Sequence, residues 1–295
     1  MWVIKHRNIF LGISGLFIAA SIAVLSVWGL KVGIDFKGGS LTEVSYPSGI
    51  PDTTQLRDRV EALNFGEAIV QPVGENDVQV KTRDLSEPEH QALVAALRGD
   101  AADMKETSFT TIGPSVGKEL KTKSIVSLII VGIAMILFIA YAFRKVGKQV
   151  SSWKYALITI VALMHDVIIT AGIFAVISHF TGAEADTLFV VALLTVLGLS
   201  VNDTIVVFDR IRENLSNKTE GDFKHIVGKS LSETMVRSLN TSLSVIIVLV
   251  ALFIVGPEST KIFALTLACG MFFGTYSSIF IASPLLTVLE DNRKK

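Results

Sequence analysis

Three charged side chains lie in long apolar stretches of the sequence, where a charge is costly and therefore marks a functional candidate. They are Asp203, Asp166 beside His165, and Arg237. A charge at the centre of a membrane helix costs about 2.5 to 3.5 kcal/mol on insertion scales. A buried carboxylate that gains and loses a guanidinium partner also changes its proton affinity. These residue types therefore predict a proton pathway.

Polar residues accompany two of these charges. Asn202 directly precedes Asp203. Arg237 is followed at i+3, i+4 and i+7, which is one helix face, by Asn240, Thr241 and Ser244. Arg237 is the first residue of its apolar stretch. Asp203 lies closer to that same membrane surface than to the opposite one, so we expect the two charges to meet inside a helix bundle.

Each residue also has a purely structural interpretation. Arg237 is equally compatible with an interfacial residue whose long stem reaches water. Asp166 beside His165 is compatible with a local polar pair. Asp203 is harder to explain in this way, because it lies six residues, about 9 Å of helix, from Asp209 at the end of its stretch.

The elements that must position these residues are membrane helices. Half of the 295 residues are hydrophobic and 18% are charged, which is too apolar for a soluble enzyme. The first stretch, Ile9 to Leu30, is uncharged for 22 residues, enough to cross about 30 Å of hydrocarbon, and it lacks a small-residue cleavage site. The other five stretches are Ser124 to Phe143, Tyr155 to Phe180, Thr187 to Asp209, Arg237 to Val255 and Lys261 to Leu289.

The distribution of Lys and Arg orients these six helices. Residues 1–8, 144–154, 209–237 and 290–295 contain 2, 4, 6 and 3 of them, which is 15 of the 27 in the chain. The short connections 181–186 and 256–260 contain none. Because basic loops stay in the cytoplasm, both termini are predicted to be cytoplasmic and residues 31–123 extracytoplasmic.

The segment 31–123 has the pattern of a small α+β domain. Strands are expected at Ser40 to Tyr46, Glu67 to Val73, Asn76 to Thr82 and Lys105 to Ile112, with helices at Asp52 to Asn64 and Glu87 to Arg98. The order βαββαβ is typical of a ferredoxin-like sandwich. The predicted organisation is therefore a first helix in residues 1–30, this domain in 31–123 and a five-helix domain in 124–295.

Several classes of function are disfavoured. Equal numbers of basic and acidic residues, 27 of each, provide no excess to bind nucleic acid, and the single Cys269 excludes a disulfide framework. Gly228-Lys229-Ser230 lacks the first glycine of a phosphate loop, whose place Phe223 takes. His90, the only histidine of the α+β domain, is expected on a solvated helix surface. We therefore predict neither an enzyme nor a metal or cofactor site.

Glycines mark two further features. Asp35, Gly38 and Gly39 follow the first helix and predict a tight turn where the chain enters the α+β domain. Gly270 and Gly274 have the spacing of close helix packing, and Pro284 is expected to kink or end the last span.

Long motifs resemble the SecF branch of the SecD/SecF family of protein-export membrane subunits, within the resistance-nodulation-division superfamily. They cover nearly the whole chain and are GIDFKGGSL from Gly33, ALMHDV from Ala162, SVNDTIVVFDRIREN from Ser200, RSLNTS from Arg237 and FFGTYSSIFIASPLL from Phe272. The pair Ser200-Val201 departs from the aromatic-serine pair of many relatives, and we expect this to affect packing only.

The resemblance implies a non-enzymatic subunit of the bacterial inner membrane. It would pair with SecD, assist a SecY-type channel with a small subunit such as YajC, and use the proton gradient in late steps of preprotein translocation. It also implies that Asp203 and Arg237 form the proton path, with Asp166 a further candidate. Two alternatives stay open: a proton-driven half-transporter for lipids or small molecules, and a passive scaffold of the channel.

Overall fold

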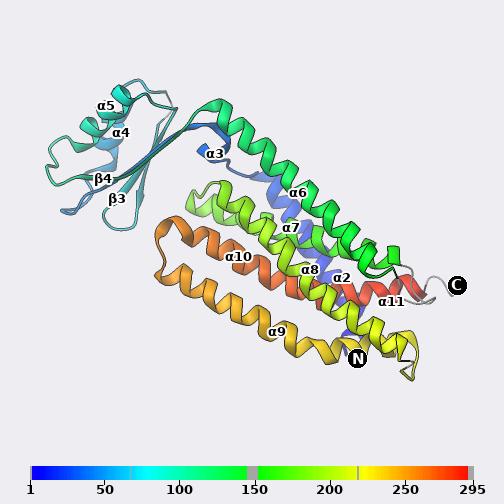
Figure 1. The fold of residues 1–295 in the computed structure, drawn as a ribbon. Coiled ribbons are helices and arrows are strands. Elements are labelled where there is room, and N and C mark those ends of the chain that lie inside the picture. The colour runs from blue at the N-terminus through cyan, green and yellow to red at the C-terminus, as the bar shows by residue number, and fades with distance from the viewer. Residues whose placement is uncertain (1, 67, 145–151, 218, 292–295) are drawn as a thin grey trace. The chain divides into compact units, whose positions relative to one another are not determined.

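The computed structural model describes residues 2–66, 68–144, 152–217 and 219–291 (Figure 1). The chain forms two compact units. One contains Val32–Ile125 together with Glu184–Thr187 and is called the α+β unit below. The other contains Met1–Lys31, Val126–Ala183 and Leu188–Lys295 and is called the helical unit.

The α+β unit has a four-stranded antiparallel sheet with two longer helices. After the short α3 (Ile34–Lys37), the elements are β1 (Gly39–Ser45), α4 (Thr53–Glu61), β2 (Ile69–Val73), β3 (Asp77–Thr82), α5 (Glu87–Arg98) and β4 (Lys105–Ile112). The strand order is β2-β3-β1-β4, with Thr42 paired to both Val80 and Phe109. Each predicted strand and helix of this unit is present in the described residues; Glu67, the first residue of the second predicted strand, lies outside them.

Local signals in the sequence account for these boundaries. The Asp52 carboxylate accepts a hydrogen bond from the Thr54 amide, which begins α4. Ser86 and Glu89 form a capping box at the start of α5. Gly74, with φ of 66°, lies in the turn between β2 and β3. These capping and turn residues account for the starts of α4 and α5 and for the turn between β2 and β3.

The core of the α+β unit lies between its sheet and helices. It contains Val44, Leu56, Val78, Leu93 and Leu97, all with no exposed side-chain surface. The buried Tyr46 hydroxyl donates to the Leu97 carbonyl at 2.8 Å and so satisfies a backbone group at the end of α5.

The expectation of a solvated His90 is wrong. Its side chain is buried, its Nε2 lies 2.9 Å from Glu106 Oε1, and its ring stacks on Phe109 at 3.7 Å. The helical periodicity of α5 places His90 on the face that packs against β4, and Glu106 supplies the partner that makes its burial tolerable.

Six helices of the described chain are long and apolar enough to cross a membrane. They begin with α2 (Arg7–Val27), which follows the short α1 (Trp2–Lys5), and continue with α6 (Pro114–Ala142), α7 (Ser152–Thr181), α8 (Thr187–Ser216) and α9 (Phe223–Val255). The sixth combines α10 (Glu258–Ser277), a π-helical segment (Ser278–Ala282) and α11 (Ser283–Asp291). Helices α8 and α9 extend well beyond the predicted apolar stretches, because their charged ends are helical too.

Pro284 does not end the sixth helix. It has no amide hydrogen to donate and its ring crowds the carbonyl four residues earlier. The π-helical turn Ser278–Ala282 directly before it changes the hydrogen-bond pattern there, and the helix continues as α11.

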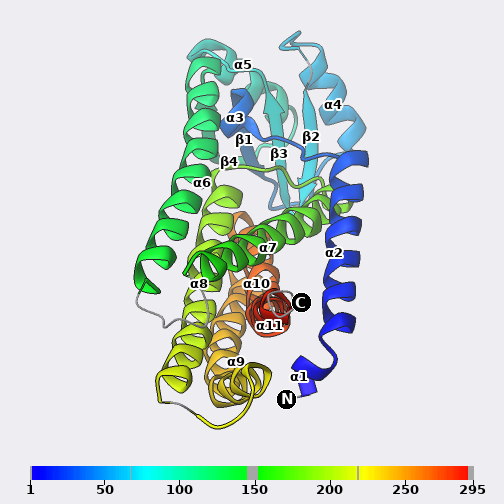
Figure 2. The same ribbon diagram turned by 90° about the vertical axis from the view of Figure 1, so that its right-hand side faces the viewer.

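Helix α10 lies between α7 and α9 in the helical unit (Figure 2). A Cβ atom at Gly270 would collide with Val196 of α8, and one at Gly274 would lie 3.0 Å from the Ser200 Cβ atom. The predicted close packing at these two glycines is therefore confirmed, and it brings the backbones of α8 and α10 together.

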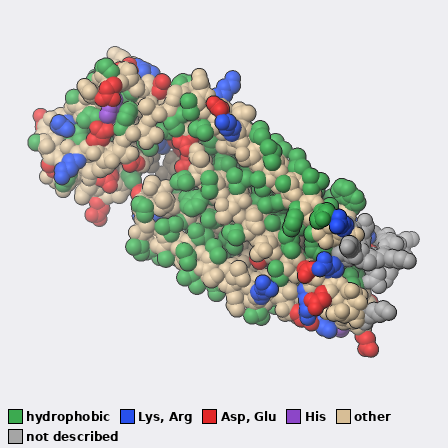
Figure 3. Space-filling model, viewed as in Figure 1, with side chains coloured by type: hydrophobic (Ala, Val, Ile, Leu, Met, Phe, Trp, Pro, Cys, Tyr) green, Lys and Arg blue, Asp and Glu red, His purple; other side chains and the backbone are tan. Residues whose placement is uncertain are grey.

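The outer surface of the helical unit is apolar. Exposed hydrophobic side chains run along α2, α6 and α9, among them Leu16, Leu137 and Ile254. Figure 3 shows hydrophobic side chains over the middle of the helices, with charged side chains grouped toward the end where α8 and α9 are joined. Such a surface suits lipid or further membrane helices.

The hydroxyl of Tyr46 provides a test of the α+β core. Tyr46→Phe leaves the Leu97 carbonyl without this donor, so we expect the free energy of unfolding of the α+β unit to fall by about 1 to 3 kcal/mol. Hydrogen exchange of the detergent-solubilised chain under increasing denaturant measures it. Gln55→Ala on the exposed face of α4 is the control, and equal stability of the two variants would contradict this role.

Tyr46 also predicts a response to alkaline pH. Burial raises the pKa of Tyr46 from 10.0 to about 12, an effect that nearby Arg59 partly opposes. The folded state therefore binds the phenolic proton more tightly than the unfolded state, and the resulting stabilisation is lost as the pH rises from 10 to 12. Tyr46→Phe should flatten the unfolding free energy over this range.

Candidate functional site

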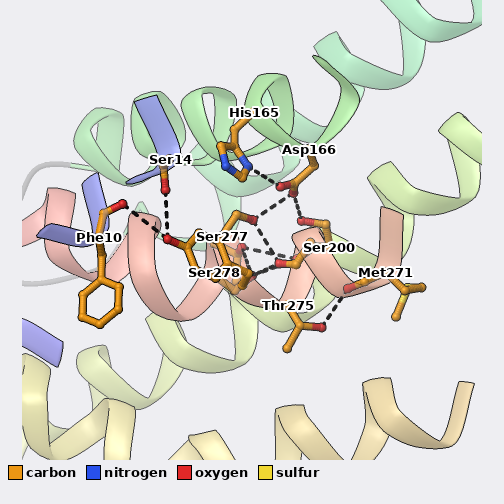
Figure 4. A network of polar contacts seen from close by, with 12 residues as sticks. Phe10, Ser14, His165, Asp166, Ser200, Met271, Thr275, Ser277 and Ser278 are labelled. Atoms are coloured by element: carbon orange, nitrogen blue, oxygen red, sulfur yellow. Dashed lines mark hydrogen bonds and ion pairs between the residues drawn. The ribbon is translucent and has the colours of Figure 1, made fainter. Parts of the chain in front are cut away.

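Asp166 is the most deeply buried carboxylate of the helical unit. Its side chain has no exposed surface, and Oδ1 lies 2.9 Å from His165 Nδ1. Its other oxygen accepts hydrogen bonds from Ser200 of α8 at 2.5 Å and from Ser277 of α10 at 2.9 Å. Asp166 thus joins three helices through hydroxyl and imidazole groups (Figure 4).

The π-helical turn contributes to the surroundings of Asp166. Ser278, the first residue of that turn, exchanges a hydrogen bond of 2.8 Å with Thr204 and lies 3.4 Å from the Ser200 carbonyl. Figure 4 shows Ser277, Ser278 and Ser200 gathered below Asp166 and His165. The distorted helix thereby directs two consecutive serines toward α7 and α8.

Asp203 forms a second polar cluster. It is 5% exposed, and its Oδ2 accepts from Ser242 of α9 at 3.2 Å and from Thr275 of α10 at 3.3 Å. The Thr275 and Ser242 hydroxyl oxygens lie 2.5 Å apart, so the single Thr275 hydroxyl hydrogen is shared between Asp203 and Ser242. Asp203 therefore lies where α8, α9 and α10 meet.

Helix α10 connects the two carboxylates. Thr275 binds Asp203 and Ser277, two residues later, binds Asp166, while Ser200 lies three residues before Asp203 on α8. The two clusters are therefore neighbouring parts of one polar region inside the helical unit. It is enclosed by apolar residues of the bundle, among them Val196, Leu197, Val207 and Ile279.

The hydroxyl groups of these clusters can accommodate an aspartate in either protonation state. Serine and threonine hydroxyls donate to a carboxylate and accept from a carboxylic acid, so they can bind either form of an aspartate. His165 Nε2 is buried and has no hydrogen-bond partner among the residues that the structure describes. The described residues contain no group of three or more metal-ligating side chains.

Arg237 does not contact Asp203 in this structure. Asp203 contacts Ser242, which lies five residues, about 7.5 Å of helix, beyond Arg237 on α9. The Arg237 side chain is exposed, and among the described residues it forms no salt bridge.

Arg237 instead lines a charged pocket of 320 Å³. The other lining residues come from the ends of α8 and α9 and are Val206, Asp209, Arg210, Glu213, Glu233 and Thr234. Within it Arg210 binds Glu233 at 2.7 Å and Glu213 at 2.6 Å. Val206 is one turn from Asp203, so the pocket begins one helical turn from the buried cluster.

The other predicted polar residues lie on exposed faces. Asn202 is exposed beside the buried Asp203, and the face of α9 that carries Arg237 is exposed at Asn240, Thr241 and Ser244. The Thr241 hydroxyl donates to the Arg237 carbonyl and the Ser244 hydroxyl to the Thr241 carbonyl, so both bond their own helix. The buried serine and threonine side chains of α9 are Ser230, Thr234, Ser238 and Ser242.

Four hydroxyl residues of the site were not predicted as functional. Ser200 was expected to affect packing only, but it donates to Asp166. The other three, Ser242, Thr275 and Ser277, lie within the quoted motifs. The sequence marks them only as small polar residues in apolar helices. That pattern fits close helix packing equally well, so it does not identify a functional site.

The turn after the first helix has the predicted backbone. Gly38 and Gly39 have φ of 81° and 138°, and a Cβ at Gly39 would lie 2.7 Å from the Thr82 carbonyl oxygen. Asp35 lies in α3, and its carboxylate accepts a hydrogen bond from the amide of Thr187, the first residue of α8.

Comparisons with known sequences agree on one family. The family described as "Protein export membrane protein SecD/SecF, C-terminal" matches residues 92–292. A protein translocase subunit SecF of Thermobaculum terrenum is 39% identical, over 98% of this chain and 94% of its own length. One from Vibrio alginolyticus is 37% identical, over 91% of this chain and 83% of its own length.

The fold is also similar to a solved structure. The crystal structure of SecDF, a translocon-associated membrane protein from Thermus thermophilus, aligns with a TM-score of 0.84 and 28% sequence identity. The alignment covers 98% of this chain but only 38% of the solved one. The chain therefore spans well under half of that SecDF protein.

Asp166 predicts a measurable contribution to stability. Asp166→Ala removes the acceptor of three buried groups, each of which costs about 1 to 3 kcal/mol when left unpaired. We expect the thermal unfolding midpoint of the detergent-solubilised protein to fall by several degrees. Glu258→Ala, at an exposed ion pair with Lys261, is the control. Equal midpoints for the two variants would show that the Asp166 contacts are not formed.

Proposed function

Because the chain belongs to the SecD/SecF family of protein-export membrane proteins, we propose that it acts as a SecF-type subunit that assists Sec-dependent protein translocation. The observation that carries the proposal is the pair of buried aspartates within a six-helix unit of this family. The subunit uses the proton-motive force, requires no cofactor and catalyses no covalent step.

The proposed orientation follows from charge. The chain lies in the bacterial inner membrane with both termini in the cytoplasm, because 15 of its 27 Lys and Arg residues lie in the four segments on that side. The α+β unit then lies outside the cytoplasm. We further infer that it is a ferredoxin-like module, supported by the antiparallel order β2-β3-β1-β4.

Asp203 is the proposed proton carrier. Among the described residues, the hydrogen-bond partners of its carboxylate are the Ser242 and Thr275 hydroxyls, and a charged pocket begins one helical turn away. A proton that enters through this pocket converts the carboxylate to a carboxylic acid, and its departure restores the carboxylate. Ser242 and Thr275 can bind both forms and keep the side chain in place.

Arg237 is the proposed partner of the charged form. It lies in the pocket, and its side chain is exposed and bound to no carboxylate among the described residues. Movement of α9 along α8 would bring its guanidinium to Asp203, and its withdrawal would favour the protonated acid. Asp166 is proposed as a second site on the same path, supported by its hydrogen bonds to Ser200 and Ser277.

SecD is the proposed partner in the membrane. The exposed polar face of α9 would meet lipid in an isolated chain, which is unfavourable for Arg237 above all. The solved SecDF protein is more than twice as long as the matched region, so it contains further chain that could cover this face. By the family resemblance, further partners are the SecY-type channel, a small subunit such as YajC and translocating preproteins.

Asp203→Asn tests the proton role. The amide keeps the size and hydrogen bonds of the side chain but cannot gain or lose a proton, so export driven by the proton gradient should fall to the level without a gradient. Inverted membrane vesicles with a preprotein substrate measure this. Glu258→Gln, at an exposed ion pair, is the matched control.

The same assay separates the alternatives. Normal gradient-driven export by Asp203→Asn would refute the proton role. A passive scaffold predicts less assembled complex but unchanged activity per complex. Loss of lipid or small-molecule transport, with preprotein export intact, would favour the half-transporter.

Arg237→Met tests the role of the guanidinium. Methionine preserves an unbranched apolar stem but removes the charge, so we expect loss of gradient-driven export with normal complex assembly. Lys261→Met removes a positive charge from the exposed pair with Glu258 and should retain export. Full export by Arg237→Met would assign Arg237 to the membrane interface instead.

A further inference from the structure

The connection between α7 and α8 is built into the α+β unit. Residues 184–187 cluster with that unit rather than with the helices they join. Val32 and Ala185 form a parallel β-bridge, and the Gly33 amide donates to the Ala185 carbonyl at 2.9 Å. A Cβ at Gly33 would lie 3.3 Å from that carbonyl oxygen, so this close approach favours glycine.

Asp35 adds a contact to the start of α8. Its Oδ2 accepts a hydrogen bond of 2.9 Å from the Thr187 amide, although the two residues are 152 positions apart. The first amides of a helix have no partner within the helix, and the helix dipole favours a negative charge there. Asp35 therefore supplies, from the α+β unit, a cap for the helix that carries Asp203.

A partly buried ion pair forms a third contact. Lys81 Nζ of β3 lies 3.1 Å from Glu184 Oε2, and the two side chains are only 16% and 21% exposed. Lys81 lies inside the sheet, opposite Leu41 of β1 and Ile69 of β2. The connection is thus attached to two separate parts of the α+β unit, the turn at residues 32–35 and the strand β3.

The helices on either side of this connection carry the buried aspartates. Helix α7 ends at Thr181 and contains Asp166, while α8 begins at Thr187 and contains Asp203. Helix α8 is continuous over 30 residues. Asp203 is 16 residues from Thr187, about 24 Å of unbroken helix, so a shift or rotation of α8 at Asp203 also moves its first residue.

We propose that residues 184–187, held by Asp35 and by the Lys81–Glu184 pair, form a permanent linkage that transmits movement of α8 to the α+β unit. Asp35, Lys81 and Glu184 are positioning residues, since none touches Asp203 or Asp166. The inference rests on the proposed function and adds the route by which a proton at Asp203 produces movement outside the membrane.

Charge reversal tests the linkage. Lys81→Glu and Glu184→Lys each place two like charges together, and each should lower gradient-driven export by about fivefold or more, the lower end of typical coupling between sites. The double variant Lys81→Glu/Glu184→Lys restores an ion pair and should restore export. Arg59→Glu, which reverses one member of the exposed Arg59–Asp100 pair in the same unit, is the matched control and should retain export.

A second readout separates transmission from stability. Hydrogen exchange of the α+β unit, measured in vesicles with and without a proton gradient, should change with the gradient in the parent protein. The single variants should lose this response while keeping normal complex abundance and gradient-independent export. Asp35→Ala should lose it too, and Asp35→Asn, which keeps an acceptor oxygen, should retain part of it.

The outcomes distinguish this inference from the proposed function. If Asp203→Asn abolishes gradient-driven export while Lys81→Glu, Glu184→Lys and Asp35→Ala retain it, the linkage is refuted and the proton role stands. If Asp203→Asn retains export, the proposed function fails whatever the linkage variants do. Failure of the double variant to recover would also overturn the assignment of the ion pair.

Discussion

The helical unit depends on the burial of two aspartates among apolar helices. A carboxylate in such a place requires partners, and here the partners are hydroxyl groups from three neighbouring helices together with His165. These contacts fix how α7, α8, α9 and α10 are rotated about their axes. Two further features support these contacts, namely Gly270 and Gly274 and the π-helical turn before Pro284. They let α10 approach closely enough for Thr275 and Ser277 to reach the aspartates.

The same constraint explains why the chain is suited to work with a partner. Hydroxyls can donate to a carboxylate and can rotate to accept from a carboxylic acid, so the same side chains can bind Asp203 in both forms. The charge that would balance Asp203 lies outside this interior, on Arg237 in the pocket between the ends of α8 and α9. The exposed polar face of α9 is therefore the surface that we propose a partner covers.

The sequence predicts the helices and strands well, because apolar length and alternation depend on residues close together in the chain. The orientation of α9 illustrates the limit. The run RSLNTS has polar residues on both faces of the helix. The face that carries Arg237 was expected to point into the bundle, but the buried residues of this run are Ser238 and Ser242. Ser242 contacts the carboxylate of Asp203 on α8 and the hydroxyl of Thr275 on α10, and neither partner can be read from the local sequence of α9. Likewise, Asp35 was recognisable as a turn residue, but its partner Thr187 is 152 residues away.

The central claim is that Asp203 gains and loses a proton within this hydroxyl cluster. Infrared difference spectroscopy of the reconstituted complex with SecD, recorded as the pH is lowered, reports carboxylic acid groups directly. We expect a carbonyl band of a protonated acid that disappears in Asp203→Asn and persists in the control Glu258→Gln. A spectrum with the same bands in the parent protein and in Asp203→Asn would contradict it.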